Sequence, residues 1–463
     1  MDNKEKLSDK LTVKKKNIYD CIGAEEKARI FAFSEDYKAF LDEAKTEREA
    51  TDYAIAMVKA AGFTEYKLGD KLKAGDKRYY DNRGKSLYVF KVGSEPLDTD
   101  GIRILAAHVD APRIDLKQMP LYEDAGMAFF KTHYYGGIKK YQWTAIPLSL
   151  HGVVIKNDGS KVTVKIGDDA GDPVFYINDL LPHLGQEQAQ KPLGTAIAGE
   201  TLNILVGGMP LKDGDDKDGS VKLGILNILN EKYGMTEEDF ISAELSCVPA
   251  FMARDVGFDR ALIGAYGHDD RVCAYPLLRA ITDVDTKKTV LGVLADKEEV
   301  GSMGNTGMQS MLLLDLITEI ASSMGYSPIA VRAASKCLSA DVNAAFDPNF
   351  AEVYEKRNSA MISCGTTMSK YTGARGKSST SDASAEFVGY VRKLFAENGV
   401  KWQTSELGKV DCGGGGTVAM YIANLNIDTV DLGVPVISMH APYEVVSKAD
   451  VYSTYEAFCA FVK

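Results

Sequence analysis

Several features of membrane and exported proteins are missing from this chain of 463 residues. No apolar run reaches the roughly 18 residues that a membrane span requires. The segment from Met1 to Lys16 is rich in lysine and acidic residues and contains no apolar stretch, so no signal peptide is expected. The sequence therefore predicts a soluble protein that is not inserted in a membrane.

Paired cysteines and an excess of positive charge are also absent. The seven cysteines are scattered, odd in number and never spaced as C-x-x-C, unlike those of a disulfide scaffold or a zinc ribbon. We interpret them as reduced thiols, which indicates a cytoplasmic protein. The 65 acidic and 54 basic residues give a formal net charge of -11. That balance argues against nonspecific nucleic-acid binding, which needs a basic surface.

The length of the chain predicts more than one domain. Strands and helices alternate at both ends, which is typical of an α/β sheet with helices on both faces. Between them, strands at 151–156 and 161–166 are separated by turn-forming clusters, and a charged loop is expected at 212–219. We therefore predict a mixed α/β sheet formed by residues 1–120 and 251–463, interrupted by a β-rich insertion at residues 121–250.

Side chains that bind metals or handle protons follow the predicted buried strands. The strands are expected at 102–107, 290–295, 334–339 and 434–439, and the residues that follow them are His108, Glu298 with Glu299, Asp341 and His440. Strands of an open α/β sheet direct their last side chains into one crevice. Asp269 instead begins a helix predicted over 272–281, where free backbone amides favour its carboxylate form.

The number and type of these residues suit a two-metal hydrolase. Two histidines and three carboxylates can hold two divalent ions with one shared carboxylate, and one glutamate is left to act as a base. Each residue alone has an ordinary explanation: a hydrogen-bonded core histidine, a solvated helix start for the glutamate pair, or a helix cap at Asp341. The metal site is favoured because these residues would otherwise all have to occur at strand ends by chance.

Five blocks of the sequence resemble the aspartyl aminopeptidase family of zinc metallopeptidases, in its bacterial branch. They are Ala-His-Val-Asp-Ala-Pro-Arg at 107–113, Asp-Lys-Glu-Glu-Val-Gly-Ser at 296–302, Ser-Ala-Asp-Val-Asn at 339–343, Asp-Cys-Gly-Gly-Gly-Gly-Thr at 411–417 and Ser-Met-His-Ala at 438–441. The similarity extends over nearly the whole chain. It implies a dinuclear centre in an α/β catalytic domain, and an inserted β-rich domain that mediates dimerisation.

The resemblance also implies a role for each candidate residue. Asp269 would bridge the two ions, Glu299 and His440 would complete one shell, and His108 with Asp341 would complete the other. Glu298 would be the general base toward a metal-activated water, and Asp110 would orient the His108 imidazole. In His268-Asp269-Asp270-Arg271 the chain departs from the Asp-Asn pair of eukaryotic members, which makes Asp269 a better bridge than Asp270.

Residues in the insertion are expected to act between subunits. His183 matches a family histidine that contacts substrate in the active site of a neighbouring subunit; a metal ligand and an ordinary loop histidine are the alternatives. The aromatic segment from Tyr134 to Gly137, which precedes Trp143, is interpreted as an oligomer contact. The resemblance implies homo-oligomers, with dimers assembled into a dodecamer.

The predicted function is an aminopeptidase that removes the N-terminal residue from peptides. The resemblance implies acidic N-terminal residues for some members, and the cations Lys370, Arg375, Lys377 and Lys409 are candidates to line such a pocket. A deacylase or carboxypeptidase of the same clan, or a noncatalytic oligomeric binding protein, are the alternative hypotheses. Zinc is the expected metal, while cobalt and manganese also suit a site of histidines and carboxylates.

Overall fold

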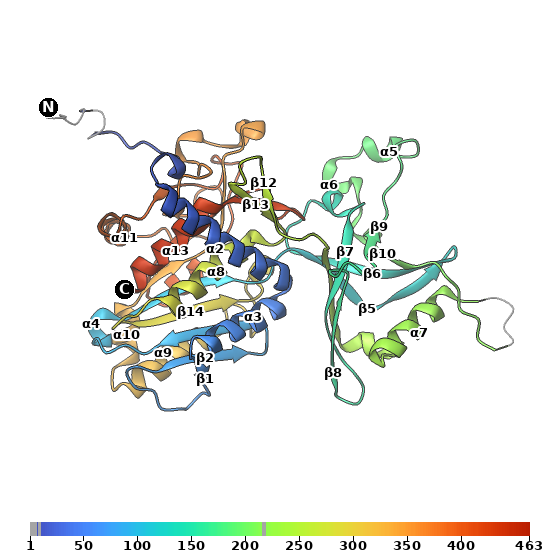
Figure 1. The fold of residues 1–463 in the computed structure, drawn as a ribbon, viewed down its shortest axis with the longest axis horizontal. Coiled ribbons are helices and arrows are strands. Elements are labelled where there is room, and N and C mark those ends of the chain that lie inside the picture. Colours follow the sequence, from blue (N-terminus) through green and yellow to red (C-terminus); the bar gives the residue numbers. More distant parts are fainter. Residues whose placement is uncertain (1–6, 8–10, 215–218) are drawn as a thin grey trace.

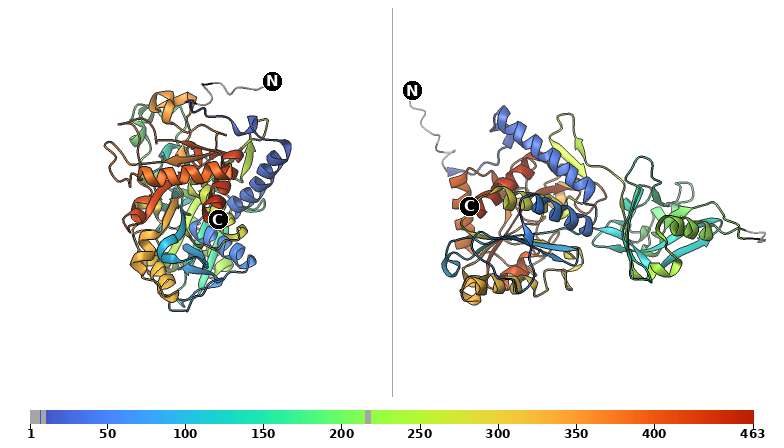
Figure 2. Two further views of the ribbon diagram at one scale, coloured as in Figure 1. Left: turned by 90° about the vertical axis from the view of Figure 1, so that its left-hand side faces the viewer. Right: turned by 60° about the horizontal axis from the view of Figure 1, so that its bottom comes forward.

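The computed structural model describes Leu7, residues 11–214 and residues 219–463. Parts of the N-terminal segment 1–16 and of the loop expected at 212–219 therefore lie outside the described residues. The chain folds into a larger lobe that contains both ends of the sequence and a smaller lobe built from its middle (Figures 1 and 2).

A nine-stranded mixed sheet forms the centre of the larger lobe, in the order β1-β2-β3-β14-β4-β15-β19-β17-β18. The inner strands β14, β4, β15 and β19 are parallel, and β3 and β17 flank them in antiparallel pairings. The strands are β1 (Thr64–Glu65), β2 (Lys77–Asn82), β3 (Ser86–Lys91), β4 (Ile102–His108), β14 (Thr289–Ala295), β15 (Lys336–Ser339), β17 (Thr366–Ser369), β18 (Trp402–Thr404) and β19 (Asp428–Gly433).

Helices cover both faces of this sheet because its inner strands are buried on both sides. Along β4, Leu105 and Ala107 pack into one core, while Ile104 and Ala106 pack into the other. The first face is covered by α2 (Ala24–Glu43), α3 (Glu47–Ala60), α8 (His268–Asp283), α11 (Ala385–Asn398) and α13 (Lys448–Val462). The second face is covered by α4 (Leu97–Asp100), α9 (Leu312–Ser323), α10 (Pro328–Ala334) and α12 (Ala419–Ala423). The predicted α/β class is confirmed.

The smaller lobe contains a second sheet in the order β11-β5-β6-β10-β9-β7-β8. Strand β11 also pairs with β7, so six of the strands form a closed ring and β8 extends it. The strands are β5 (Arg113–Asp124), β6 (Met127–Tyr135), β7 (Pro147–Ile155), β8 (Lys161–Ile166), β9 (Phe175–Ile177), β10 (Ile204–Gly207) and β11 (Ala243–Pro249). Its helices are α5 (Gln186–Ala189), α6 (Leu193–Ala196) and α7 (Val221–Tyr233).

A third, five-stranded sheet lies in the larger lobe, in the order β12-β13-β21-β20-β16. It consists of β12 (Arg254–Val256), β13 (Leu262–Ala265), β16 (Asn343–Ala344), β20 (Pro435–Ile437) and β21 (Glu444–Ser447). The strand predicted at 434–439 is therefore shorter than expected, and it does not belong to the main sheet. The hydrophobic run predicted the strand, but such a run carries no information about which sheet the strand joins.

Short 3-10 helices connect many of these elements: η1 (Ile18–Asp20), η2 (Lys140–Trp143), η3 (Gly199–Thr201), η4 (Glu237–Ser242), η5 (Glu298–Val300), η6 (Pro348–Val353) and η7 (Lys356–Asn358). The seven cysteines are free thiols. Within the described part of the chain, no helix has the length and apolar character needed to cross a membrane.

Candidate metal centre

Three parallel strands bring four of the predicted residues to one edge of the main sheet. His108 is the last residue of β4, and it lies opposite Ala295, the last residue of β14. Glu298 and Glu299 follow β14 in η5, and Asp341 follows β15 by two residues. Because β14, β4 and β15 are parallel neighbours, their carboxyl ends meet at this edge.

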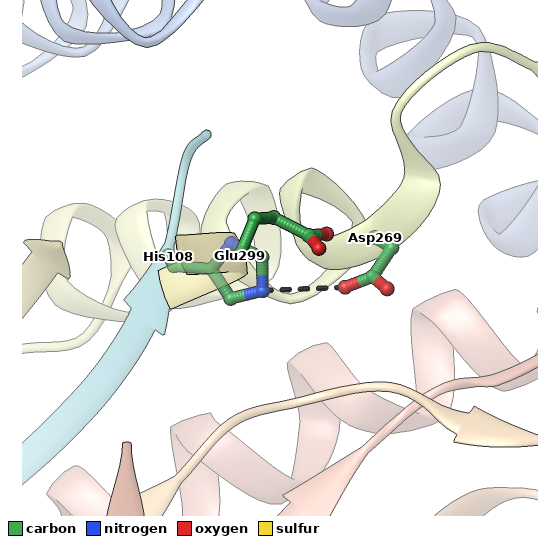
Figure 3. Close-up of side chains that lie close together, drawn as sticks. All are labelled: His108, Asp269 and Glu299. Carbon is green, nitrogen blue, oxygen red and sulfur yellow. Dashed lines mark ion pairs between the residues drawn. The ribbon is translucent and has the colours of Figure 1, made fainter. Parts of the chain in front are cut away.

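Asp269 reaches the same place from the start of α8. The chain enters this helix through Gly267, whose φ of 76° lies in the left-handed region. Asp269 itself has a φ of -80° and a ψ of 107°, so the regular helix begins only after it. This bend directs the Asp269 carboxylate toward His108 and Glu299 (Figure 3).

The two oxygens of Asp269 face two different imidazoles. Its Oδ1 lies 3.2 Å from Nε2 of His108, and its Oδ2 lies 3.1 Å from Nε2 of His440. His440 comes from the loop between β20 and β21. A carboxylate whose two oxygens face two different imidazoles has the arrangement needed to bridge two ions.

The remaining carboxylates divide between the two imidazoles. Glu299 Oε2 lies 3.7 Å from Nε2 of His440, and ligand atoms of His108, Asp269 and Glu299 lie within 4.8 Å of one another. On the other side, ligand atoms of His108, Glu298 and Asp341 lie within the same distance of one another. Glu298 is thus placed where it could be either a ligand or a base.

The donors fit divalent cations. Glu299 Oε1 is a buried carboxylate oxygen that accepts no hydrogen bond within the described chain. Burial, and then the neighbouring Asp269, raise the pKa of Glu299 well above its ordinary range. Burial, and then Glu298, do the same to the pKa of Asp341. A bound cation would favour the ionised form of carboxylates that are buried this close together, and imidazole with carboxylate is a ligand set for zinc.

The imidazoles pair with Asp269 as ions in the metal-free protein. Burial opposes a charge on His440, but hydrogen bonding to Asp269 and the nearby Glu299 raise its pKa to about 10. Burial also opposes a charge on His108, but hydrogen bonds to Asp110 and Asp269 raise its pKa well above the ordinary range. For Asp269, the same two imidazoles outweigh burial and lower the pKa. Each histidine must therefore lose its proton before it can ligate a metal.

Asp110 connects His108 to the glutamate pair. Its carboxylate accepts the backbone N–H groups of Glu298 and Glu299 at 3.1 and 3.2 Å, and it lies 3.3 Å from Nδ1 of His108. The Asp110 backbone carbonyl is also 3.0 Å from the same Nδ1. Asp110 therefore fixes the orientation of the imidazole and the position of η5 together.

Glu298 has an environment suited to proton transfer. Its side chain is 18% exposed, and its Oε2 lies 3.9 Å from Nε2 of His108. Burial raises its pKa to about 7, and the carboxylates of Asp269 and Asp110 add to the increase. A general base works best when its pKa lies near the working pH.

The smaller lobe contributes to the site through the end of β6. Tyr135 donates its hydroxyl hydrogen to Asp110 at 2.8 Å, and the Gly137 carbonyl lies 2.8 Å from Nδ1 of His440. Gly136 has a φ of 77°, and a Cβ on it would lie 3.2 Å from Glu299 Oε2. An oligomer contact stays a prediction for this segment, and within this chain the segment contacts the site residues. Two glycines after an aromatic strand end were the signal for a close backbone approach.

Two buried acids that the sequence analysis did not assign hold the ligands through their backbone. Asp270 accepts the backbone N–H of His108 at 3.2 Å, whereas the two oxygens of Asp269 lie beside the two imidazoles, so Asp269 is the bridging candidate. Glu444 accepts the N–H of His440 at 2.7 Å and the N–H of Asp269 at 3.1 Å. No metal-ligand pattern in the sequence indicates Glu444, because its carboxylate binds backbone N–H groups and not a metal.

The other predicted residues lie elsewhere. His183 is exposed in the segment between β9 and α5. Lys370 and Lys377 both pair with Asp382. Lys377, with Arg375 and Lys409, lines a narrow cavity of about 50 Å³ in which His440 has no part.

A larger cavity of about 600 Å³ lies directly against His440. Apolar side chains of the larger lobe form much of its wall, including Phe350, Ile437 and Met439. Apart from His440, its charged residues are Lys139 from the smaller lobe and Asp347 from the larger one. The wall of this cavity thus combines apolar and polar residues, most of them uncharged, beside the His440 half of the centre.

Comparison with known proteins assigns this architecture to a family. The model of the aminopeptidase I zinc metalloproteases (M18) matches residues 40–462. A probable M18 family aminopeptidase 1 from Clostridium acetobutylicum is 49% identical over 456 residues, which cover 96% of this chain and 98% of that protein. The crystal structure of an M18 aminopeptidase from Thermotoga maritima has a TM-score of 0.92 at 43% identity, and covers 98% of this chain and 100% of its own. A dodecamer of S. cerevisiae mApe1 shares the fold, with a TM-score of 0.76 at 22% identity, and covers 92% of this chain and 95% of its own.

Proposed function

Because this chain belongs to the M18 aminopeptidase I family of zinc metalloproteases, we propose that it hydrolyses peptides at a centre of two divalent ions bridged by Asp269. The family resemblance drawn from the sequence motifs is confirmed, and the chain is a metal-dependent aminopeptidase. Relatives that align with nearly the whole chain are named probable M18 family aminopeptidase 1. The alternative hypotheses of a noncatalytic binding protein and of a deacylase or carboxypeptidase are therefore without support.

The observation that carries the two-ion proposal is the position of Asp269 between His108 and His440. Each of its oxygens faces one imidazole, at 3.2 and 3.1 Å. One ion would be held by His440 and Glu299 with Asp269, and the other by His108 and Asp341 with Asp269. Zinc is the metal that the family name indicates, and cobalt or manganese would fit the same donors.

The chemistry requires a proton acceptor beside the ions. Two bound divalent ions would polarise the carbonyl of the scissile peptide bond and activate water for attack. Glu298 would take the proton of that water and pass it to the leaving amine, since its carboxylate lies at the edge of the centre and its pKa is about 7. Asp110 would fix the position of Glu298 relative to the His108 imidazole through the contacts described above.

The cavity beside His440 is proposed to take the side chain of the N-terminal residue. Because Lys139 and Asp347 balance each other among apolar residues, we expect an uncharged side chain to be preferred. An acidic preference, as the sequence resemblance implies for some members, would instead require the cations Arg375, Lys377 and Lys409 of the narrow cavity to reach the substrate.

The proposed assembly is a homo-oligomer in which the smaller lobe, the insertion predicted at residues 121–250, mediates dimerisation. The distant S. cerevisiae relative was solved as a dodecamer, which supports a similar assembly here. Exposed His183 in that lobe would then contact substrate in the partner subunit. The cytoplasm remains the expected location, based on the free cysteines.

Metal analysis combined with a substrate panel tests the function. Metal-free enzyme would be loaded with zinc, cobalt or manganese and assayed on leucyl, alanyl, glutamyl and aspartyl arylamides, each with its N-acetylated form as the control. We expect two ions per chain and cleavage only of substrates with a free amine. Cleavage confined to the N-acetylated set would contradict an aminopeptidase, and faster cleavage of the acidic pair would contradict the uncharged preference.

A further inference from the structure

We infer that Glu444 is a positioning residue that sets the spacing between the bridging carboxylate and His440, and so controls the affinity of the centre for metal. This inference rests on the proposed two-ion function. Glu444 does not face the reacting atoms; it acts through the backbone of two ligand residues that are 171 positions apart in the chain (440 less 269).

The two oxygens of Glu444 are shared between these residues. Its Oε1 accepts the N–H of His440 at 2.7 Å, and its Oε2 accepts the N–H of Asp269 at 3.1 Å. The Glu444 side chain is buried, and the residue is 1% exposed. One carboxylate therefore fixes the distance between the loop that bears His440 and the start of the helix that bears Asp269.

The five-stranded sheet gives Glu444 a rigid base from which to do this. Glu444 is the first residue of β21 and is paired in register with Ala265, the last residue of β13. Four residues after Ala265 the chain reaches Asp269, and four residues before Glu444 it passes His440. Both ligands thus lie on short connections next to the adjacent strands β13 and β21. Glu444 accepts a backbone N–H from each of these connections.

This role differs from general stabilisation, because the affected distance lies within one half of the centre. His440 Nε2 and Asp269 Oδ2 are 3.1 Å apart, and a change in either backbone position alters the gap that an ion must fill. Outer-shell partners of metal ligands commonly change metal affinity by about 10- to 100-fold when they are replaced. We expect Glu444 to fall in that range.

Asp450 offers a matched control in the same lobe. It is also fully buried, and its carboxylate also accepts two backbone N–H groups, from Ser363 and Gly365, both at 2.7 Å. Neither of these residues is a ligand candidate. The substitution D450N therefore removes the same kind of buried interaction from the fold without touching the centre.

The test is a zinc titration of the metal-free protein, with a competing chelator and with the thermal midpoint recorded for each variant. E444Q keeps the shape of the side chain but turns an amide group toward one of the two N–H donors. We expect E444Q to weaken zinc binding by about 10- to 100-fold and D450N to leave it within about twofold, although both lower the midpoint. E444D, which is too short to reach both donors, replaces E444Q if the latter does not fold, with the same expectation.

The possible results distinguish a failure of the Glu444 role from a failure of the proposed two-ion centre. Wild-type affinity in E444Q or E444D, with two ions bound to the parent protein, overturns the role of Glu444 and leaves the centre intact. An equal loss of affinity in D450N overturns it as well, because the effect would then belong to the fold. A parent protein that does not bind two ions overturns the proposed centre, and this inference with it.

Discussion

Replacing Glu298 by glutamine is the sharpest test of how the centre works, because the structure allows this residue two roles. Its carboxylate groups with His108 and Asp341 within 4.8 Å, as a ligand would, and its pKa of about 7 suits a base. E298Q keeps the size of the side chain. The backbone N–H that Glu298 donates to Asp110 is also retained, so η5 should stay in place.

The expected effect follows from loss of the proton acceptor alone. General-base catalysis contributes about 10²- to 10⁴-fold to a rate, which corresponds to about 3 to 5 kcal/mol in the activation free energy. We therefore expect E298Q to lower kcat by that factor, with little change in KM and with both ions retained. The assay is steady-state hydrolysis of an aminoacyl arylamide, with zinc content measured on the same preparation.

Glu299 provides the matched control because it is the next residue of the same short helix. Its N–H also goes to Asp110, but its carboxylate faces His440 and Asp269. E299Q should lose one ion. If E298Q loses an ion in the same way, Glu298 is a ligand; if its kcat stays within about fivefold of the parent, it is not the base. Either result would refute the assignment.

Two further predictions concern the surroundings of the centre, and a third concerns a buried ion pair of the smaller lobe. G136A should lower zinc affinity by at least about tenfold in a chelator competition, because Gly136 has a positive φ and the new Cβ would lie 3.2 Å from Glu299 Oε2; unchanged affinity would contradict this close approach. Zinc binding should tighten and release protons as the pH rises from about 6 to 8, since Asp269 and Glu299 outweigh burial and raise the pKa of His440 to about 10; a calorimetric titration in buffers of different ionisation enthalpy measures the released protons, and pH-independent binding would contradict the ion pairing. H151A should destabilise the protein by about 3 kcal/mol in denaturant unfolding. Burial opposes a charge on His151, but Asp168 and Glu49 together outweigh it and raise the pKa. The stabilising charge is therefore fully present below about pH 6.5 and is lost as the pH rises through the raised value; a difference between parent and variant that grows with pH would contradict this.

The positions of the strand-end residues could be predicted because a parallel sheet brings the ends of its strands together. His108 ends β4, and the glutamate pair and Asp341 follow β14 and β15; all three strands are fully or largely buried. The sequence pattern could therefore indicate both the strands and the edge at which they meet. The roles within the centre came from the family motifs and not from the pattern.

Other parts of the site could not be predicted, for physical reasons. The strand before His440 is only three residues long and lies in a separate sheet, and a short apolar run does not specify its partner. Tyr135 acts through a hydroxyl on Asp110, across the junction of the two lobes, and Glu444 acts through two backbone N–H groups. Such contacts depend on tertiary placement, and no local spacing in the sequence marks them.

A crystal structure of the zinc-loaded enzyme, with anomalous data collected at the zinc edge, would test the bridged two-ion centre directly. We expect two zinc peaks per chain with the Asp269 carboxylate between them, one ion beside His108 and Asp341 and the other beside Glu299 and His440. A single peak, or two peaks that are bridged by a residue other than Asp269, would contradict it.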